Sequence, residues 1–202
     1  MNRTLLWMFG LAGIAAFALP AFGEPNAREV TEVLKRDFKA RGQATMDRVV
    51  QDGLQRICTE THDKPPAEVA KALEADQMKT IQYPSGSLMG DWKRAEKMAQ
   101  SGRGAMWSDK PGVAAGGSCY NCHQISPQET SYGTIGPSLL GFGKKRGNGP
   151  DMQRYVYGKI YNAKAYSACS QMPRLGYSGT LTDEQIKDFT ALLLDPASPV
   201  NQ

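Results

Sequence analysis

The run Cys119-Tyr120-Asn121-Cys122-His123 constrains this chain more than any other feature of its sequence. Two cysteines separated by two residues can each add across a vinyl group of haem, and the histidine that follows is then held beneath the iron as its proximal ligand. The pattern therefore predicts a single covalently bound haem c, attached at Cys119 and Cys122 and ligated by His123.

Two other uses of such a run have to be weighed. A C-x-x-C pair can be a redox dithiol, and two cysteines with one histidine can be part of a zinc site. A thioredoxin-like dithiol would need a βαβ pattern, which this chain lacks, and a structural zinc would need a fourth ligand. Haem attachment is the better interpretation, and it predicts a c-type cytochrome.

The first 23 residues have the composition of a secretory signal. Arg3 supplies a positive charge, residues 5–19 are largely apolar, and Ala21-Phe22-Gly23 offers small residues where a signal peptidase cuts. The apolar stretch is shorter than the roughly 20 residues that a spanning helix needs. We expect a signal peptide over residues 1–23, a periplasmic mature protein and no membrane span after cleavage.

The charge of the mature chain narrows the range of partners. Removal of 23 of the 202 residues would leave 179, and loss of Arg3 would lower the formal net charge from +4 to +3. The two haem propionates would offset most of that charge. Without a strong basic field, nucleic acid is not an expected partner.

Helical periodicity runs through the mature chain, and no alternating strand pattern of useful length interrupts it. In the first part the apolar positions with helical spacing are Val30, Val33, Leu34 and Phe38, continued by Met46, Val49, Val50, Leu54 and Ile57. Pro65 and Pro66 then open a further helix, because proline suits a first turn whose N–H groups are unpaired. These features predict a helical extension over residues 24–89.

From Gly90 onward the sequence has the pattern of a compact cytochrome domain. Asp91 can cap a helix that carries Trp92, and Thr182 with Gln185 forms a capping-box pattern ahead of a terminal helix. The terminal helix should cross the first one and close the fold. The chain is therefore expected to be all-α, with a monohaem cytochrome c domain over residues 90–202.

The second axial ligand has few candidates. Met172 is followed by Pro173, which restricts it to an extended backbone suited to a loop that presents a thioether to haem. Met152 lies in a stretch expected to be helical, where packing is the usual role. His62 lies in a polar stretch, and an open sixth site is the remaining alternative. We predict His123 and Met172 as the axial ligands of the iron.

The segment around Pro137 resembles one found in class I cytochromes c. Residues 136–141 read G-P-S-L-L-G. In that class a proline carbonyl in such a segment accepts a hydrogen bond from the ring N–H of the proximal histidine, which orients the ring. The resemblance implies this role for Pro137 and a class I cytochrome c fold for the domain.

Cys58 and Cys169 remain after haem attachment. They are an even pair in an oxidising compartment, so a disulfide between them is possible and would tie the extension to the loop before Met172. Both can also remain free, and Cys169 could then be a reactive thiol near the haem edge.

Several segments together resemble the SoxX family, the small cytochrome subunits of SoxAX complexes in bacterial thiosulfate oxidation. They are D-W-K-R-A-E-K-M-A-Q-S-G-R-G at residues 91–104, C-Y-N-C-H-Q at 119–124, S-Y-G-T-I-G-P-S-L-L-G-F-G at 131–143 and C-S-Q-M-P-R-L-G-Y at 169–177. The resemblance covers nearly all of the mature chain.

The resemblance implies a division of labour. SoxAX joins thiosulfate oxidatively to a cysteine of the carrier SoxYZ, as an L-cysteine S-thiosulfotransferase, and its active-site haem belongs to SoxA, a dihaem or monohaem cytochrome subunit. The SoxX-like subunit accepts the electrons and passes them to a small soluble cytochrome acceptor. No catalytic residue is expected on this chain. A free periplasmic electron carrier and a ligand-sensing haem protein are the alternatives.

Overall fold

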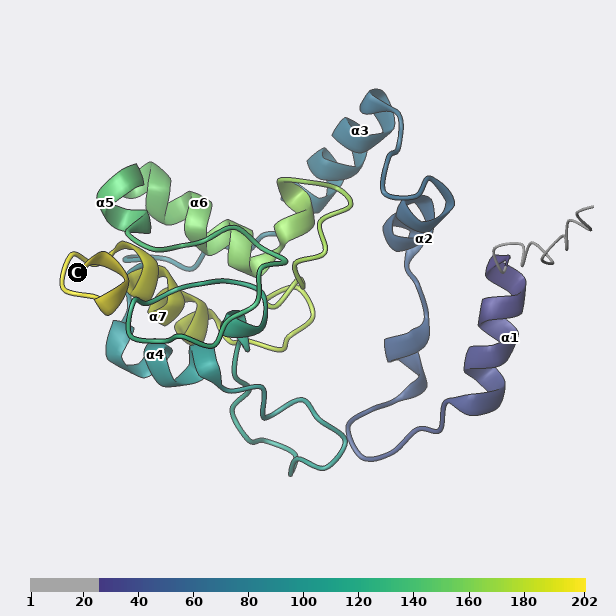
Figure 1. Cartoon of the computed structure of the whole chain (residues 1–202). Helices are drawn as coiled ribbons and strands as arrows, with labels where there is room; N and C mark the ends of the chain where they lie inside the picture. The colour runs from purple at the N-terminus through teal and green to yellow at the C-terminus, as the bar shows by residue number, and fades with distance from the viewer. Residues whose placement is uncertain (1–25) are drawn as a thin grey trace, which may run out of the picture. The chain divides into compact units, whose positions relative to one another are not determined.

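The computed structural model describes residues 26–202, so the signal peptide expected over residues 1–23 lies outside the described part (Figure 1). The chain divides into two compact units, one ending at Phe38 and one running from Lys39 to Gln202. Within residues 26–202 the structure is helical, and the only β-pairing is an isolated bridge between Arg41 and Ala44. The all-α prediction is confirmed. None of the described helices is both long and apolar enough to cross a bilayer.

Helix α1, Ala27–Asp37, is the described part of the first unit's secondary structure. It begins at a capping box. The side-chain oxygen of Asn26 accepts from the N–H groups of Arg28 and Glu29 at 3.1 Å each, and the Glu29 carboxylate accepts from the Asn26 N–H. These bonds pair N–H groups that a helix start otherwise leaves without partners.

The helix expected from Met46 to Ile57 is broken, so the prediction that it is continuous was wrong. Met46–Val49 forms a short 3₁₀ helix, η1, and Val50 is extended. Helix α2, Gly53–Glu60, begins only after Asp52, whose carboxylate accepts from the Gln55 N–H at 2.8 Å while the Gln55 side chain accepts from the Asp52 N–H. This capping box fixes the start of the helix, and apolar spacing upstream of it does not extend the helix.

Helix α3, Ala67–Met78, follows Pro65 and Pro66 as expected. Its C-terminal end packs against the 3₁₀ helix η3, Ala163–Ala165. Asn162, which is fully buried, donates from Nδ2 to Gln77 Oε1 at 3.0 Å and to Thr80 Oγ1 at 2.9 Å. The 39–89 part of the expected extension therefore packs with residues 90–202 in one unit.

The core lies among three helices, which are α4 (Trp92–Gln100), α6 (Pro150–Tyr161) and α7 (Asp183–Leu194). Two short helices, α5 (Phe142–Arg146) and η4 (Pro199–Asn201), lie at one end of it. Helices α4 and α7 pack side by side (Figure 1). The expected caps are confirmed, since Asp91 accepts from the Lys93 N–H and Thr182 forms a capping box with Gln185. Buried side chains that fill the core include Ala95, Tyr157, Ile160, Ile186, Phe189 and Leu192.

A polar link joins the start of α4 to α7. The Asp188 carboxylate is 2% exposed and accepts from the Asp91 N–H at 2.7 Å and from two nitrogens of Arg94 at 2.7 and 2.8 Å. Gly90 permits this approach, because a Cβ there would lie 2.3 Å from the Asp188 carboxylate. The link fixes the position of α4, which in turn supports the candidate site.

Candidate functional site

The Cys119–His123 run forms one compact turn. Its first residues make a 3₁₀ helix, η2, Cys119–Asn121, and the carbonyl of Cys119 accepts from the N–H groups of Cys122 at 3.1 Å and His123 at 2.9 Å. The loop before the turn is bonded to the end of α4, through Gly117 N–H to the Met98 carbonyl and Ser118 N–H to that of Ser101. The fold core therefore positions the two cysteines and the histidine.

The Cys119 thiol lies in apolar surroundings. A Cβ added at Gly117 would lie 2.8 Å from Cys119 Sγ and 2.9 Å from the Phe189 ring, so both side chains lie close to Gly117, and Cys119 packs on the hydrophobic core. Burial raises the pKa of the Cys119 thiol to about 12, because a thiolate there would lose its hydration. The thiol is therefore protonated at neutral pH. Neither Cys119 nor Cys122 is in a disulfide.

A second segment, residues 133–139, runs along the turn. Three of its backbone N–H groups each donate at 2.8 Å to a carbonyl of the run or of the residue after it. The pairs are Gly133 to Tyr120, Gly136 to Cys122 and Leu139 to Gln124. A side-chain bond from Ser138 Oγ to Gln124 Oε1 at 2.9 Å adds to them. This ladder holds two loops together without a β-sheet.

Two glycines allow the two segments to approach so closely. A Cβ at Gly136 would lie 2.2 Å from Cε1 and 2.5 Å from Nδ1 of the His123 ring, and one at Gly133 would lie 1.8 Å from the Asn121 carbonyl oxygen. Neither position can hold a side chain without displacing its neighbour. The imidazole therefore lies against the bare backbone of Gly136.

The proximal-histidine candidate has one ring nitrogen engaged. Nδ1 of His123 lies 2.8 Å from the carbonyl oxygen of Pro137. A carbonyl can only accept, so Nδ1 carries the proton and Nε2 is the nitrogen that can ligate a metal. The structure thus brings together Cys119, Cys122, His123 and Pro137.

Met172 lies in another loop that packs against the same core as Cys119. It is half-buried, and its N–H donates to Ser170 Oγ at 3.2 Å. A cavity of about 380 Å³ adjoins it, and among the described residues its lining includes none from the Cys119–His123 run. Met152 is half-buried on α6 and packs on the core, whereas His62 is exposed in a left-handed turn after α2.

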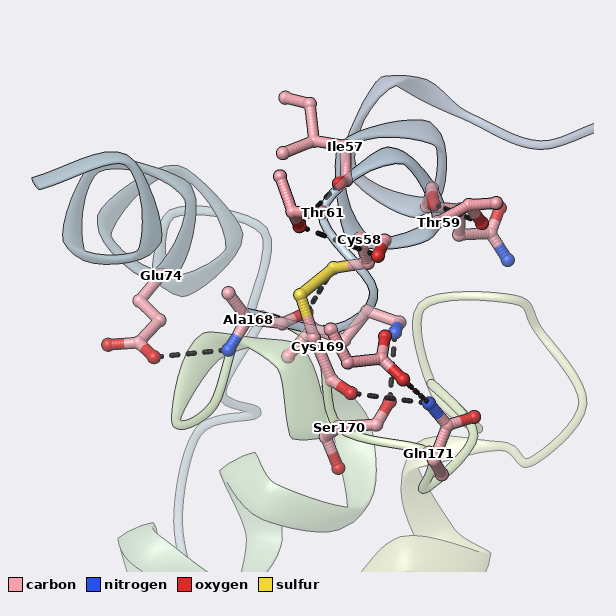
Figure 2. The surroundings of a disulfide bond; sticks show 12 residues. Ile57, Cys58, Thr59, Thr61, Glu74, Ala168, Cys169, Ser170 and Gln171 are labelled. Carbon is pink, nitrogen blue, oxygen red and sulfur yellow. Dashed lines mark hydrogen bonds between the residues drawn. A yellow bond between two sulfur atoms is a disulfide. The ribbon is translucent and has the colours of Figure 1, made fainter. Parts of the chain in front are cut away.

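Cys58 on α2 and Cys169 form a disulfide with an S–S distance of 2.07 Å (Figure 2). Next to it, the Glu74 carboxylate on α3 accepts from the Ala168 N–H at 3.0 Å, and Gln171 Nε2 donates to Asp63 Oδ2 at 3.0 Å. The loop before Met172 is therefore bonded to both α2 and α3.

Four residues around these loops make tertiary contacts that the sequence analysis did not predict. They are Asp52, Glu74, Gly136 and Arg174. Asp52 and Gln55 have the spacing of a capping box, which predicts the cap but not the ion pair that Asp52 also makes with Arg174. Glu74 is an ordinary helical carboxylate whose partner is 94 residues away. Contacts at such separations depend on the tertiary fold and have no local signal.

Comparison with known proteins relates this chain over its full length to a bacterial lipoprotein. No protein-family model matches the chain. An uncharacterized lipoprotein of Aquifex aeolicus (strain VF5) is 36% identical over 211 aligned residues, which cover 100% of this chain and 99% of the relative. Identity at this level across both whole sequences shows common descent, and the chain therefore belongs to the same family as this Aquifex aeolicus lipoprotein.

Proposed function

We propose that the protein is a monohaem c-type cytochrome that transfers electrons. The observation that carries the proposal is the arrangement around His123. Its imidazole is fixed by the Pro137 carbonyl through Nδ1 and lies against Gly136, in the same turn as two cysteines that are outside any disulfide. This donor set is the one that covalent haem attachment requires.

The chain's residues have distinct roles in this proposal. Cys119 and Cys122 would hold the haem as thioethers, and His123, through Nε2, and Met172, through its sulfur, would ligate the iron. Pro137 orients the imidazole, because its carbonyl oxygen accepts a hydrogen bond from Nδ1–H. The bound group would supply a reversible one-electron change, and the thioether of Met172 would favour its ferrous state. With His123 and Met172 both bound to the iron, no position on it would be open to substrate.

We further propose a class I cytochrome c fold and a SoxX-like role. The chain would take electrons released when a SoxA-type partner joins thiosulfate to a cysteine of a SoxYZ-type carrier, and pass them to a small soluble cytochrome. The four segments that resemble the SoxX family support this role. The expected signal peptide and the naming of the Aquifex aeolicus relative as a lipoprotein agree with an exported protein, and we propose the periplasm.

Spectroscopy tests the ligand set. The ferric protein should have the weak far-red band that arises from sulfur-to-iron charge transfer, and Met172→Ala should abolish it. Met152→Ala is the matched control, because that methionine also packs on the core, and it should retain the band. Retention of the band in Met172→Ala, or its absence from the wild type, would contradict the assignment. Binding of carbon monoxide by the ferrous wild type at neutral pH would favour a ligand-sensing role instead.

Reconstitution tests the SoxX-like role. The chain alone should be reducible but inactive in thiosulfate conjugation. Together with the haem subunit that co-purifies with it from thiosulfate-grown cells, it should conjugate thiosulfate to the cysteine of a SoxYZ-type carrier. Turnover by the isolated chain would contradict this division of labour. A monomeric chain that forms no complex with such a haem subunit would favour a free electron carrier.

A further inference from the structure

We propose that α2 and α3 are a clamp that holds the loop of residues 168–174, here called the ligand loop, in the position that keeps Met172 on the iron. This inference rests on the proposed role of Met172 as an axial ligand. It assigns a function to helices that lie outside the haem-binding segments themselves.

The first part of the clamp is covalent. Cys169 lies three residues before Met172 and is joined to Cys58, which is 5% exposed on α2 (Figure 2). The neighbouring Ala168 is 3% exposed, and its N–H donates to the Glu74 carboxylate on α3 at 3.0 Å. One end of the ligand loop is thus bonded to both helices.

The second part of the clamp lies two residues after Met172. The Arg174 side chain is only 12% exposed. It forms a short ion pair with the carboxylate of Asp52, the N-cap of α2, and donates to Gln77 Oε1 on α3 at 3.2 Å. Met172 is therefore flanked on both sides by residues bonded to the same two helices.

Such flanking bonds matter because a thioether is a weak ligand for ferric iron. When the loop is free, ordering it on the haem costs conformational entropy, and an external ligand can displace the methionine more easily. A loop already held in position has lost that entropy on folding. The apparent affinity for an external ligand then falls in proportion to the small fraction of molecules in which the loop is open.

Imidazole titration of the ferric holoprotein tests the clamp. Asp52→Asn removes the charge opposite Arg174 and retains the helix cap, because asparagine caps as well as aspartate. Glu74→Ala removes the acceptor for the Ala168 N–H, and Glu74→Gln restores an oxygen acceptor. We expect Asp52→Asn and Glu74→Ala each to lower the apparent Kd for imidazole by about tenfold, and Glu74→Gln to be close to the wild type.

Asp76→Asn is the matched control. Asp76 lies on α3 and pairs with Lys79 at 2.7 Å on the surface, away from the ligand loop. Its imidazole affinity should equal that of the wild type. If Asp52→Asn and Glu74→Ala lower the melting temperature but bind imidazole with wild-type affinity, the two residues are merely structural and the clamp is wrong.

Met172→Ala separates this failure from failure of the proposed function. If Met172→Ala binds imidazole much more tightly than the wild type while the clamp variants do not, Met172 is a ligand and only the clamp is overturned. If Met172→Ala leaves the imidazole affinity unchanged, methionine ligation is wrong and the clamp fails with it.

Discussion

The Nδ1 atom of His123 lies 2.8 Å from the carbonyl oxygen of Pro137, and the preceding residue, Gly136, lies against the same imidazole ring. One short segment therefore fixes both the orientation of the ring and the nitrogen that bears the proton. A donor held in this way is ready to ligate a metal through Nε2 without further ordering.

Gly136→Ala should disturb this arrangement. The added methyl group would meet the His123 ring at 2.2 Å, so the ring or the loop must move. We expect the free energy of unfolding of the holoprotein to fall by about 1 to 3 kcal/mol, measured by denaturant titration. Gly53→Ala is the control, because its Cβ would meet nothing within 4 Å. Equal stability of Gly136→Ala and the wild type would refute the close contact.

Replacement of both Cys58 and Cys169 by alanine should lower the free energy of unfolding by about 4 to 5 kcal/mol. The two residues are 111 positions apart, so the bond closes a long loop of the unfolded chain and removes much of its entropy. Denaturant unfolding of the double variant measures the effect. A loss below about 1 kcal/mol would mean that the bond restricts the unfolded chain far less than the chain-entropy model implies.

Asp188→Ala should be among the more destabilising single substitutions between α4 and α7. It leaves the Asp91 N–H without its acceptor and removes two bonds from Arg94. We expect a loss of about 2 to 3 kcal/mol in thermal or denaturant unfolding. Glu184→Ala, which removes an exposed carboxylate from its pair with the largely covered Lys187 on the same helix, should cost less than about 1 kcal/mol. Similar losses for the two variants would contradict the importance of the buried carboxylate.

The Asp52 pair should depend on pH in a definite direction. Burial raises the pKa of Asp52, but the Gln55 N–H and Arg174 more than offset it, so the pKa is lowered. A carboxylate with a lowered pKa stabilises the fold above the ordinary aspartate pKa of about 3.9, and the contribution is lost as the pH falls through the folded-state pKa. The stability difference between wild type and Asp52→Asn should therefore be largest near neutral pH and vanish in acid. A difference independent of pH would be inconsistent with an ionised pair.

Local chemistry made parts of the fold predictable from the sequence. The caps at Asp91 and Thr182 were visible because capping depends on residues within one turn of the helix. The break before α2 was not expected, because the apolar spacing from Met46 to Ile57 satisfies a helical period even though the chain is extended at Val50. The spacing of apolar residues indicates which face of a helix can be buried, but it does not show at which residue the helix begins.

The candidate site also has a part that the sequence predicted and a part that only the tertiary fold shows. The Cys119–His123 run is a local motif, and its turn is closed by bonds within five residues. The bonds of Glu74 and Arg174 to their partners link residues 94 and 122 positions apart, so only the tertiary fold reveals them. The sequence shows a glycine at position 136, but it does not show that the His123 ring lies against it.

The intact mass of the purified mature protein under denaturing conditions tests the central claim most directly. Thioether bonds survive unfolding, so the account predicts the mass of the chain plus one haem, with both Cys119 and Cys122 resistant to alkylation after reduction. A protein with the unmodified chain mass, in which both cysteines are alkylated after reduction, would contradict covalent haem attachment.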